Sequence, residues 1–202
     1  MPKIIWKGFI KSEDEFPEGD LPENAVKFNE PGSMSEMMLR AFPFAIPAFL
    51  ICFLSMFLKI YFNDGIIVIN PLFMIIGFVI SFAGLLVHEL LHAAVYPKKS
   101  VVEIGIILKS FSVFAFSTYP LTKKRFVLMS LLPIILGIVP LVLFIVSPAE
   151  YTNSNSILFM LTGMGLVSPY PDYFNVYNII LKQAPKGSLI QFSNTHCYWY
   201  IP

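Results

Sequence analysis

The sequence predicts an α-helical membrane protein with about four transmembrane helices and a small cytoplasmic β-hairpin between the second and the third. Of its 202 residues, 56% are hydrophobic and only 13% are charged, which is too apolar for an ordinary soluble domain. The mean hydropathy of +0.70 also indicates a membrane protein. Long apolar stretches, the placement of the basic residues and one β-rich segment define the individual elements.

The apolar stretches are long enough to cross about 30 Å of hydrocarbon as helices. We expect a four-span membrane domain over residues 41–181, with its spans at residues 41–62, 66–96, 126–146 and 157–181. Residues 1–40 are rich in acidic residues and have no early apolar run, so they are predicted to form a cytoplasmic N-terminal arm rather than a secretory signal. Residues 182–202 are predicted to form a cytoplasmic tail.

A β-rich segment follows the second predicted span. The stretch "VVEIGIILKSFSVFAFSTYP" is rich in β-branched and aromatic residues and has a polar break at Lys109 and Ser110. This pattern predicts a β-hairpin over residues 101–118, with strands at 101–108 and 111–118. Residues 189–192 of the tail are expected to add another short strand.

Basic residues gather on one side of the predicted membrane domain. They precede the first span, fill the loop after the second span and follow the fourth, whereas the short loops after the first and third spans contain none. The positive-inside rule therefore predicts a multi-pass protein of the cell membrane with both termini and the middle loop in the cytoplasm. Lys59, near the outer end of the first span, is expected to reach the far membrane surface. No basic stripe with interleaved aromatic residues suggests a nucleic-acid partner.

The second predicted span contains the stretch "GLLVHELLHAAVY" at residues 84–96. His88 and His92 are four residues apart, so they lie on one face of a helix, and Glu89 follows His88 directly. This H-E-x-x-H arrangement aims two imidazoles at one metal ion and sets a carboxylate beside them.

The fourth predicted span contains one acidic residue, Asp172. Glu89 and Asp172 are the only acidic residues inside predicted spans, and Asp172 follows two prolines in "SPYPDYFN". His88 and Asp172 each precede a cytoplasmic lysine by ten residues, which puts both about 15 Å below it along straight helices. If the two spans are neighbours, they run parallel and present His88, His92 and Asp172 to one ion.

Zinc suits this set of residues, because two neutral imidazoles and a carboxylate leave a fourth position for water. Glu89 is then the general base that takes a proton from the water and passes it to the leaving amine. The predicted reaction is peptide-bond hydrolysis. Asn175 lies three residues after Asp172 on the same helical face and is expected to bind the substrate backbone or orient the aspartate.

Other interpretations stay open at this point. Glu103 competes as the third ligand, since it lies downstream of the histidines, and His196 is more typical of a surface residue of the tail. His88 and His92 can also be polar residues packed between helices, and Asp172 can cap a helix after the proline break. Iron, cobalt or manganese can replace zinc. The alternative function is a non-proteolytic membrane protein with a structural or metal-handling site.

The pattern of motifs resembles known families. "HELLH" in one span, a β-rich cytoplasmic segment, an intervening span and then "SPYPDYFN" are similar to the site-2-protease-like intramembrane zinc metalloproteases. The chain from about Leu21 onward, including "LPENAVKF", "YPLTKKRFVLMSLLP" and "PKGSLI", more closely resembles a family of small bacterial membrane proteins described as zincin peptidases. The resemblance implies that His88, His92 and Asp172 are zinc ligands, that Glu89 is the catalytic base and that the protein is bacterial. Site-2 proteases commonly have a glycine after this aspartate, where the chain has Tyr173.

The expected substrate is a membrane-anchored protein or peptide that is locally unfolded, and the lipid bilayer is the second expected partner. An exposed edge of the 101–118 hairpin can hold an extended substrate as an added strand. The sequence makes no prediction of the oligomeric state.

Overall fold

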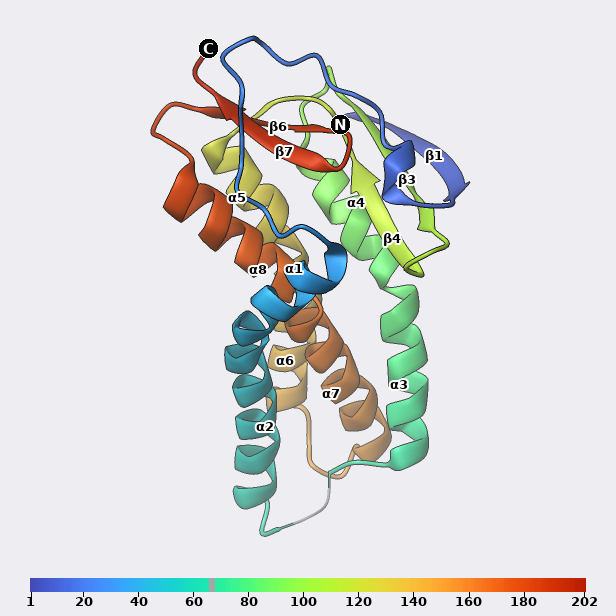
Figure 1. Ribbon diagram of the computed structural model, residues 1–202. Coiled ribbons are helices and arrows are strands. Elements are labelled where there is room, and N and C mark those ends of the chain that lie inside the picture. Colours follow the sequence, from blue (N-terminus) through green and yellow to red (C-terminus); the bar gives the residue numbers. More distant parts are fainter. Residues whose placement is uncertain (66–67) are drawn as a thin grey trace. The chain divides into compact units, whose positions relative to one another are not determined.

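The computed structural model describes residues 1–65 and 68–202. The chain divides into two compact units, each formed by segments that are distant in sequence (Figure 1). We call the first the sheet unit; it consists of Met1–Met37, Leu86–Leu132 and Asp172–Pro202. The second, the helical unit, consists of Met38–Leu85 and Pro133–Pro171.

One sheet of the sheet unit has the strand order β1-β3-β4. The predicted hairpin forms β3 (Val101–Ile107) and β4 (Ser112–Phe116), which pair antiparallel. The sequence analysis did not predict β1 (Lys3–Ile10), which pairs parallel with β3 and has a register shift between Trp6 and Gly8. The first residues of the predicted arm therefore extend the hairpin into a three-stranded sheet.

The second sheet has the strand order β2-β7-β6-β5 and is antiparallel throughout. The predicted tail strand is present as β6 (Leu189–Ser193), and it pairs with β7 (His196–Tyr200) across a turn with Asn194 at a φ of 50°. Asparagine tolerates this left-handed conformation better than most residues. Two short strands, β2 (Val26–Lys27) and β5 (Leu121–Thr122), complete the sheet.

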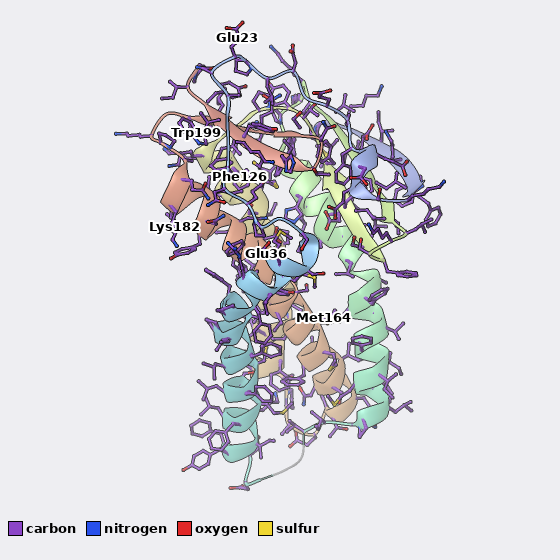
Figure 2. All side chains as sticks on the ribbon, in the orientation of Figure 1. Glu23, Glu36, Phe126, Met164, Lys182 and Trp199 are labelled. Carbon is purple, nitrogen blue, oxygen red and sulfur yellow. The ribbon has the colours of Figure 1, made fainter. Side chains whose placement is uncertain are left out.

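Helices and both sheets enclose the core of the sheet unit. Its helical segments are η1 (Glu13–Glu15), the start of α1 (Met34–Ala41), nearly all of α4 (Leu85–Val95), α5 (Lys123–Leu131), the end of α8 (Tyr170–Asn175) and η4 (Val176–Gln183). Phe126 of α5 is 1% exposed and packs in one cluster with residues of α4, β3, β6 and η4, and Trp199 of β7 packs against that cluster (Figure 2). Ile10, Ile107, Phe114 and Phe116 form a second, smaller cluster.

The helical unit contains η2 (Phe42–Ala45), α2 (Ile46–Tyr61), α3 (Pro71–Ala83), α6 (Ile135–Val146) and α7 (Thr152–Val167). The segment η3 (Leu132–Ile134) leads into α6. Glycines let α6 and α7 approach closely, since a Cβ at Gly137 would lie 2.5 Å from the backbone nitrogen of Leu166. Small residues at such contacts are typical of helices packed within a membrane.

Within the described residues, three helical segments are long and apolar enough to cross a membrane: Ser35–Tyr61, Pro71–Val95 and Lys123–Val146. The predicted count of four is not confirmed, because residues 157–181 are divided among α7, α8 and η4. The break coincides with Pro169 and Pro171, which lack the backbone N–H that a continuous helix needs. Residues 66 and 67, the predicted start of the second span, lie outside the described residues.

Lys59 of α2 contacts the end of α6. Its side chain is buried in the helical unit, where Nζ donates hydrogen bonds to the carbonyl oxygens of Phe144 and Ser147 at the end of α6. The cation therefore compensates the free carbonyl groups and the negative end of a helix dipole. Its position relative to the far surface of the membrane stays a prediction.

Candidate metal centre

Helix α4 positions the two histidines of the H-E-x-x-H motif. His88 and His92 lie one turn apart, and both side chains are buried. Their Nε2 atoms are 2.9 Å apart, and the ring planes meet at 80°. The four-residue spacing places both rings on one side of the helix, as the sequence predicts. The two Nε2 atoms therefore converge on a single point.

A backbone carbonyl sets the orientation of His92. Its Nδ1 lies 2.7 Å from the carbonyl oxygen of Met129 in α5. A carbonyl only accepts hydrogen bonds, so Nδ1 carries a proton, and Nε2 has a lone pair when the ring is neutral. Histidines that bind metals are usually held in this way by a hydrogen bond at the other ring nitrogen.

Asp172 lies in α8 and brings a carboxylate to the same point. Its Oδ2 is 3.3 Å from Nε2 of His88 and 3.6 Å from Nε2 of His92. The sequence promotes a local helix here, because Pro171 fits a first turn, where its missing N–H costs nothing. Asp172 and Asn175 are three residues apart in α8 and so lie on a common side of that helix.

The three side chains fit a tetrahedral metal ion. Ligand atoms around zinc with bonds of about 2.0 to 2.2 Å are separated by about 3.3 Å, and the observed separations run from 2.9 to 3.6 Å. Among the described residues, His88, His92 and Asp172 form a group whose ligand atoms all lie within 4.8 Å of one another. Two imidazole nitrogens and a carboxylate oxygen are donors that zinc prefers. A cation also balances the lone pairs that converge there.

Glu89 lies beside this group without joining it. Its carboxylate accepts a hydrogen bond from the backbone N–H of Ala115 in β4. The charge of the histidines and of Asp172 acts on Glu89 at close range. The carboxylate is thus held next to the candidate metal position, where it can exchange a proton with a bound water.

The other predicted site residues lie elsewhere or at the margin. The carboxylate of Glu103 in β3 lies 3.0 Å from the Lys7 ammonium, so this glutamate is engaged in an ion pair within the sheet. Nδ1 of His196 in β7 lies 3.7 Å from the Glu30 carboxylate. Neither belongs to the converging group of His88, His92 and Asp172. Asn175 ends α8, one helical turn from Asp172.

Two contributors were not predicted from the sequence: the carbonyl of Met129 and the amide of Ala115. Both are backbone groups: every residue carries the carbonyl, and every residue except proline carries the N–H. No residue type marks them, and their role depends on which strand and helix pack beside α4.

Comparison with known families adds a direct finding. A sequence profile of the family described as "Putative zincin peptidase" matches residues 81–189, which is more than half of the chain. Comparisons with curated proteins and with solved structures find no match. The matched segment includes the histidines, Glu89 and Asp172. The chain therefore belongs to this zincin peptidase family.

Proposed function

We propose that the protein is a membrane-embedded zinc metallopeptidase that hydrolyses a peptide bond in a membrane-associated polypeptide. The observation that carries the proposal is the convergence of His88, His92 and Asp172 beside Glu89. The helix that supplies three of these residues belongs to a segment, Pro71–Val95, that is long and apolar enough to cross a membrane. Zincin family membership supports the reaction class.

His88, His92 and Asp172 hold the zinc ion in this proposal, and Met129 keeps the His92 ring in the tautomer that can bind it. A bound zinc ion supplies Lewis acidity, which makes a water molecule acidic near neutral pH and polarises the substrate carbonyl. Four buried or half-buried ionisable groups in an apolar setting are costly unless they share such a partner.

Glu89 moves the proton. Its carboxylate takes a proton from the attacking water and delivers it to the nitrogen of the departing amine, so that a neutral amine leaves. The Ala115 amide donates to this carboxylate, which restricts its rotation and keeps it directed toward the reacting atoms. General acid–base catalysis of this kind contributes a factor of about 100 to 10,000 in rate.

The edge of β4 is the proposed binding surface for the scissile segment. β4 is the last strand of its sheet, and the Ala115 N–H points to Glu89 rather than to β3. Backbone groups of alternate residues point the same way along a strand, so Val113 and Ala115 present their outer edge on the side of the catalytic carboxylate. An extended polypeptide that adds to this edge as a strand brings its backbone next to Glu89.

The proposed orientation places both termini in the cytoplasm. Both termini and the loop after α4 belong to the sheet unit, as do all basic residues except Arg40 and Lys59. Clustering of lysine and arginine on one side of the spans is typical of the cytoplasmic side. The scissile bond would then lie near the cytoplasmic surface of the cell membrane.

The test compares the parent with Glu89→Gln. Each purified protein is loaded with zinc, its metal content is measured, and it is incubated with a detergent extract of cell membranes. New protein N-termini are then labelled and counted by mass spectrometry. We expect Glu89→Gln to retain its zinc and to lose cleavage by a factor of about 100 to 10,000.

The matched control is Glu103→Gln, which makes the same chemical change at a carboxylate that pairs with Lys7. It should cleave as the parent does. Equal cleavage by Glu89→Gln would remove this residue from the mechanism. A folded, zinc-loaded parent that generates no new N-termini would favour the structural or metal-handling alternative.

A further inference from the structure

Strand β1 and the β3–β4 turn expose large apolar side chains. Trp6 and Phe9 of β1 are 55% and 66% exposed, and Phe111 in the turn is 83% exposed. Ile4 is also exposed. We call Ile4, Trp6, Phe9 and Phe111 the apolar rim. Contiguous exposed apolar residues of this size usually mark a surface that binds a partner or a membrane.

The β1 members of the rim lie on one face of their sheet. The register with β3 gives three cross-strand pairs: Ile4 with Val102, Trp6 with Ile104 and Phe9 with Ile106. Val102 and Ile104 pack in the core cluster that also contains residues of α4. The β1 members of the rim therefore lie on the same face of the sheet as Val102 and Ile104. They extend this face beyond the residues that the core covers.

The contacts of the sheet with α4 show how far along the axis of this helix the apolar rim lies. Val101 starts β3 six residues after the end of α4, so β3 begins near the C-terminal end of the helix. Ala115, the cross-strand partner of Ile104, contacts Glu89, which lies six residues, or about 9 Å, before that end. The strands thus run back along α4, as the hairpin in Figure 1 shows.

This direction places Trp6 level with Glu89, because Trp6 pairs with Ile104. Phe9 and Phe111 lie further in the direction of the N-terminal end of α4, by about 7 Å and up to about 13 Å at 3.3 Å per strand residue. Exposed residues of α4 near the level of Trp6, namely Leu86, Val87 and Leu90, are also apolar. A membrane that surrounds α4 therefore reaches the level of the rim.

Lysines occupy the opposite end of the same strands. Lys3 pairs with Val101, and its backbone N–H donates to the carbonyl of Ser100. Lys98 and Lys99 are exposed in the adjoining turn, just after α4 ends. These lysines therefore lie next to the C-terminal end of α4, where phosphates of anionic lipids would face a helix that crosses the membrane.

The acidic residues of this region follow the other face of the sheet. Phe16, just after η1, stacks on Phe116 at a ring distance of 4.4 Å and contacts Phe114. These two phenylalanines lie on the face opposite to Ile104, because they alternate with Ala115 along β4. Lys109 in the turn lies close enough to Glu13 for their charges to interact. The charges of Glu13 and Lys109 therefore compensate each other beside the turn.

We propose that the apolar rim enters the lipid bilayer, in the leaflet where α4 ends, with Trp6 at the boundary of headgroups and acyl chains. Lys3, Lys98 and Lys99 then lie against anionic lipid phosphates. Tryptophan favours this boundary because its ring is apolar and its N–H remains hydrated. The inference requires that α4 crosses the membrane, and it is independent of peptide hydrolysis.

The two tryptophans of the chain, Trp6 and Trp199, allow a direct test. Trp199→Phe leaves Trp6 as the single emitter and is reconstituted into vesicles of phosphatidylcholine and phosphatidylglycerol, with and without bromine high in the acyl chains. We expect blue-shifted emission that brominated lipid reduces about twofold, as for an interfacial ring, with little quenching by aqueous iodide. Trp6→Phe, in which only the partly buried Trp199 emits, is the matched control for reconstitution.

Other outcomes would overturn the proposal. Emission at the wavelength of a hydrated tryptophan, quenched by iodide and unaffected by bromine, would show that water covers the rim. Protection from both quenchers would show that protein covers it, either a partner or a second copy of this chain. If Trp199→Phe fails to fold, the spectrum of Trp6→Phe subtracted from that of the parent yields the Trp6 signal and the same comparison.

Discussion

Two buried polar clusters of this protein, one in each unit, balance donors and acceptors differently. In the helical unit, the Lys59 ammonium donates to the carbonyls of Phe144 and Ser147 and to the Ser147 hydroxyl at 3.0 Å. Asn155 accepts from Ser147 and donates to the carbonyl of Pro148 at 2.9 Å. Each of these donors has an acceptor within the cluster, so the hydrogen bonds of the cluster are complete.

In the sheet unit, three groups that could hold a metal ion converge. In its neutral form, His92 has a lone pair on Nε2 because Nδ1 donates to the Met129 carbonyl, and Nε2 lies close to a carboxylate oxygen of Asp172 and to Nε2 of His88. Such a cluster can bind a cation from outside the chain, whereas the Lys59 cluster contains its own. Burial and polarity alone do not separate the two; the balance of donors and acceptors does.

Among the predicted variants, removal of a metal ligand should have the largest effect. Asp172→Ala and His92→Ala each remove one of three protein ligands, so saturating zinc should no longer stabilise the protein. Zinc in excess over its dissociation constant by a factor of about 1,000 adds about 4 kcal/mol to the unfolding free energy of the parent. Thermal unfolding in detergent, with and without zinc, measures the difference. Equal stabilisation of parent and variants would contradict the ligand set.

Disruption of the Lys59 cluster should affect stability alone. Lys59→Met keeps the apolar stem and leaves the carbonyls at the end of α6 without their donor. We expect a loss of about 1 to 3 kcal/mol in unfolding free energy, as for an unpaired buried polar group, with the zinc content of the folded protein unchanged. Metal analysis of the folded fraction checks the second part. Loss of zinc would show that Lys59 also supports the metal centre.

A half-buried carboxyl group, that of Glu30, should make stability depend on pH. Burial raises the pKa of Glu30 to about 7, against the opposing effects of the Cys197 amide and Lys27. The folded state thus retains a proton that the unfolded state has lost, so stability contributed by neutral Glu30 declines as pH rises from about 4.5 to 7 and stays low above 7.

Glu30→Gln removes this titration, so the loss of unfolding free energy with rising pH should be smaller by about 1 kcal/mol. This value is below the full effect of the pKa shift because the carboxyl is partly hydrated. Unfolding midpoints of parent and variant at pH 5 and pH 8 measure it. A parent whose stability rises between these pH values, with the rise removed by Glu30→Gln, would reverse the assigned sign.

The smallest effect is expected at an ion pair that lies partly in water. Lys7 and Glu103 form an ion pair at 3.0 Å, and their side chains are 38% and 21% exposed. Glu103→Gln should change the unfolding free energy by less than about 1 kcal/mol, as is usual for surface pairs, and should leave zinc binding intact. A loss of zinc in this variant would restore Glu103 as a ligand candidate.

Sequence patterns predicted the elements whose signal is local. Alternation in residues 101–118 predicted the hairpin, and long apolar runs predicted three segments that can cross a membrane. The fourth predicted span was less reliable because proline and local hydrogen bonding divide residues 157–181 into three helical segments. Strand β1 was overlooked, although "KIIWKGFI" is rich in β-forming residues, because acidic residues dominate the arm that follows it.

The sequence by itself determined the chemical identity of the candidate centre: the spacing of His88 and His92 puts both rings on one helical face whatever surrounds the helix. Only the tertiary structure showed that Asp172, and not Glu103, lies next to the two histidines, since residues about eighty positions apart meet only when the chain folds. It also supplied the Met129 carbonyl and the Ala115 amide. Backbone groups are identical along the chain, so packing alone selects which of them orient a side chain.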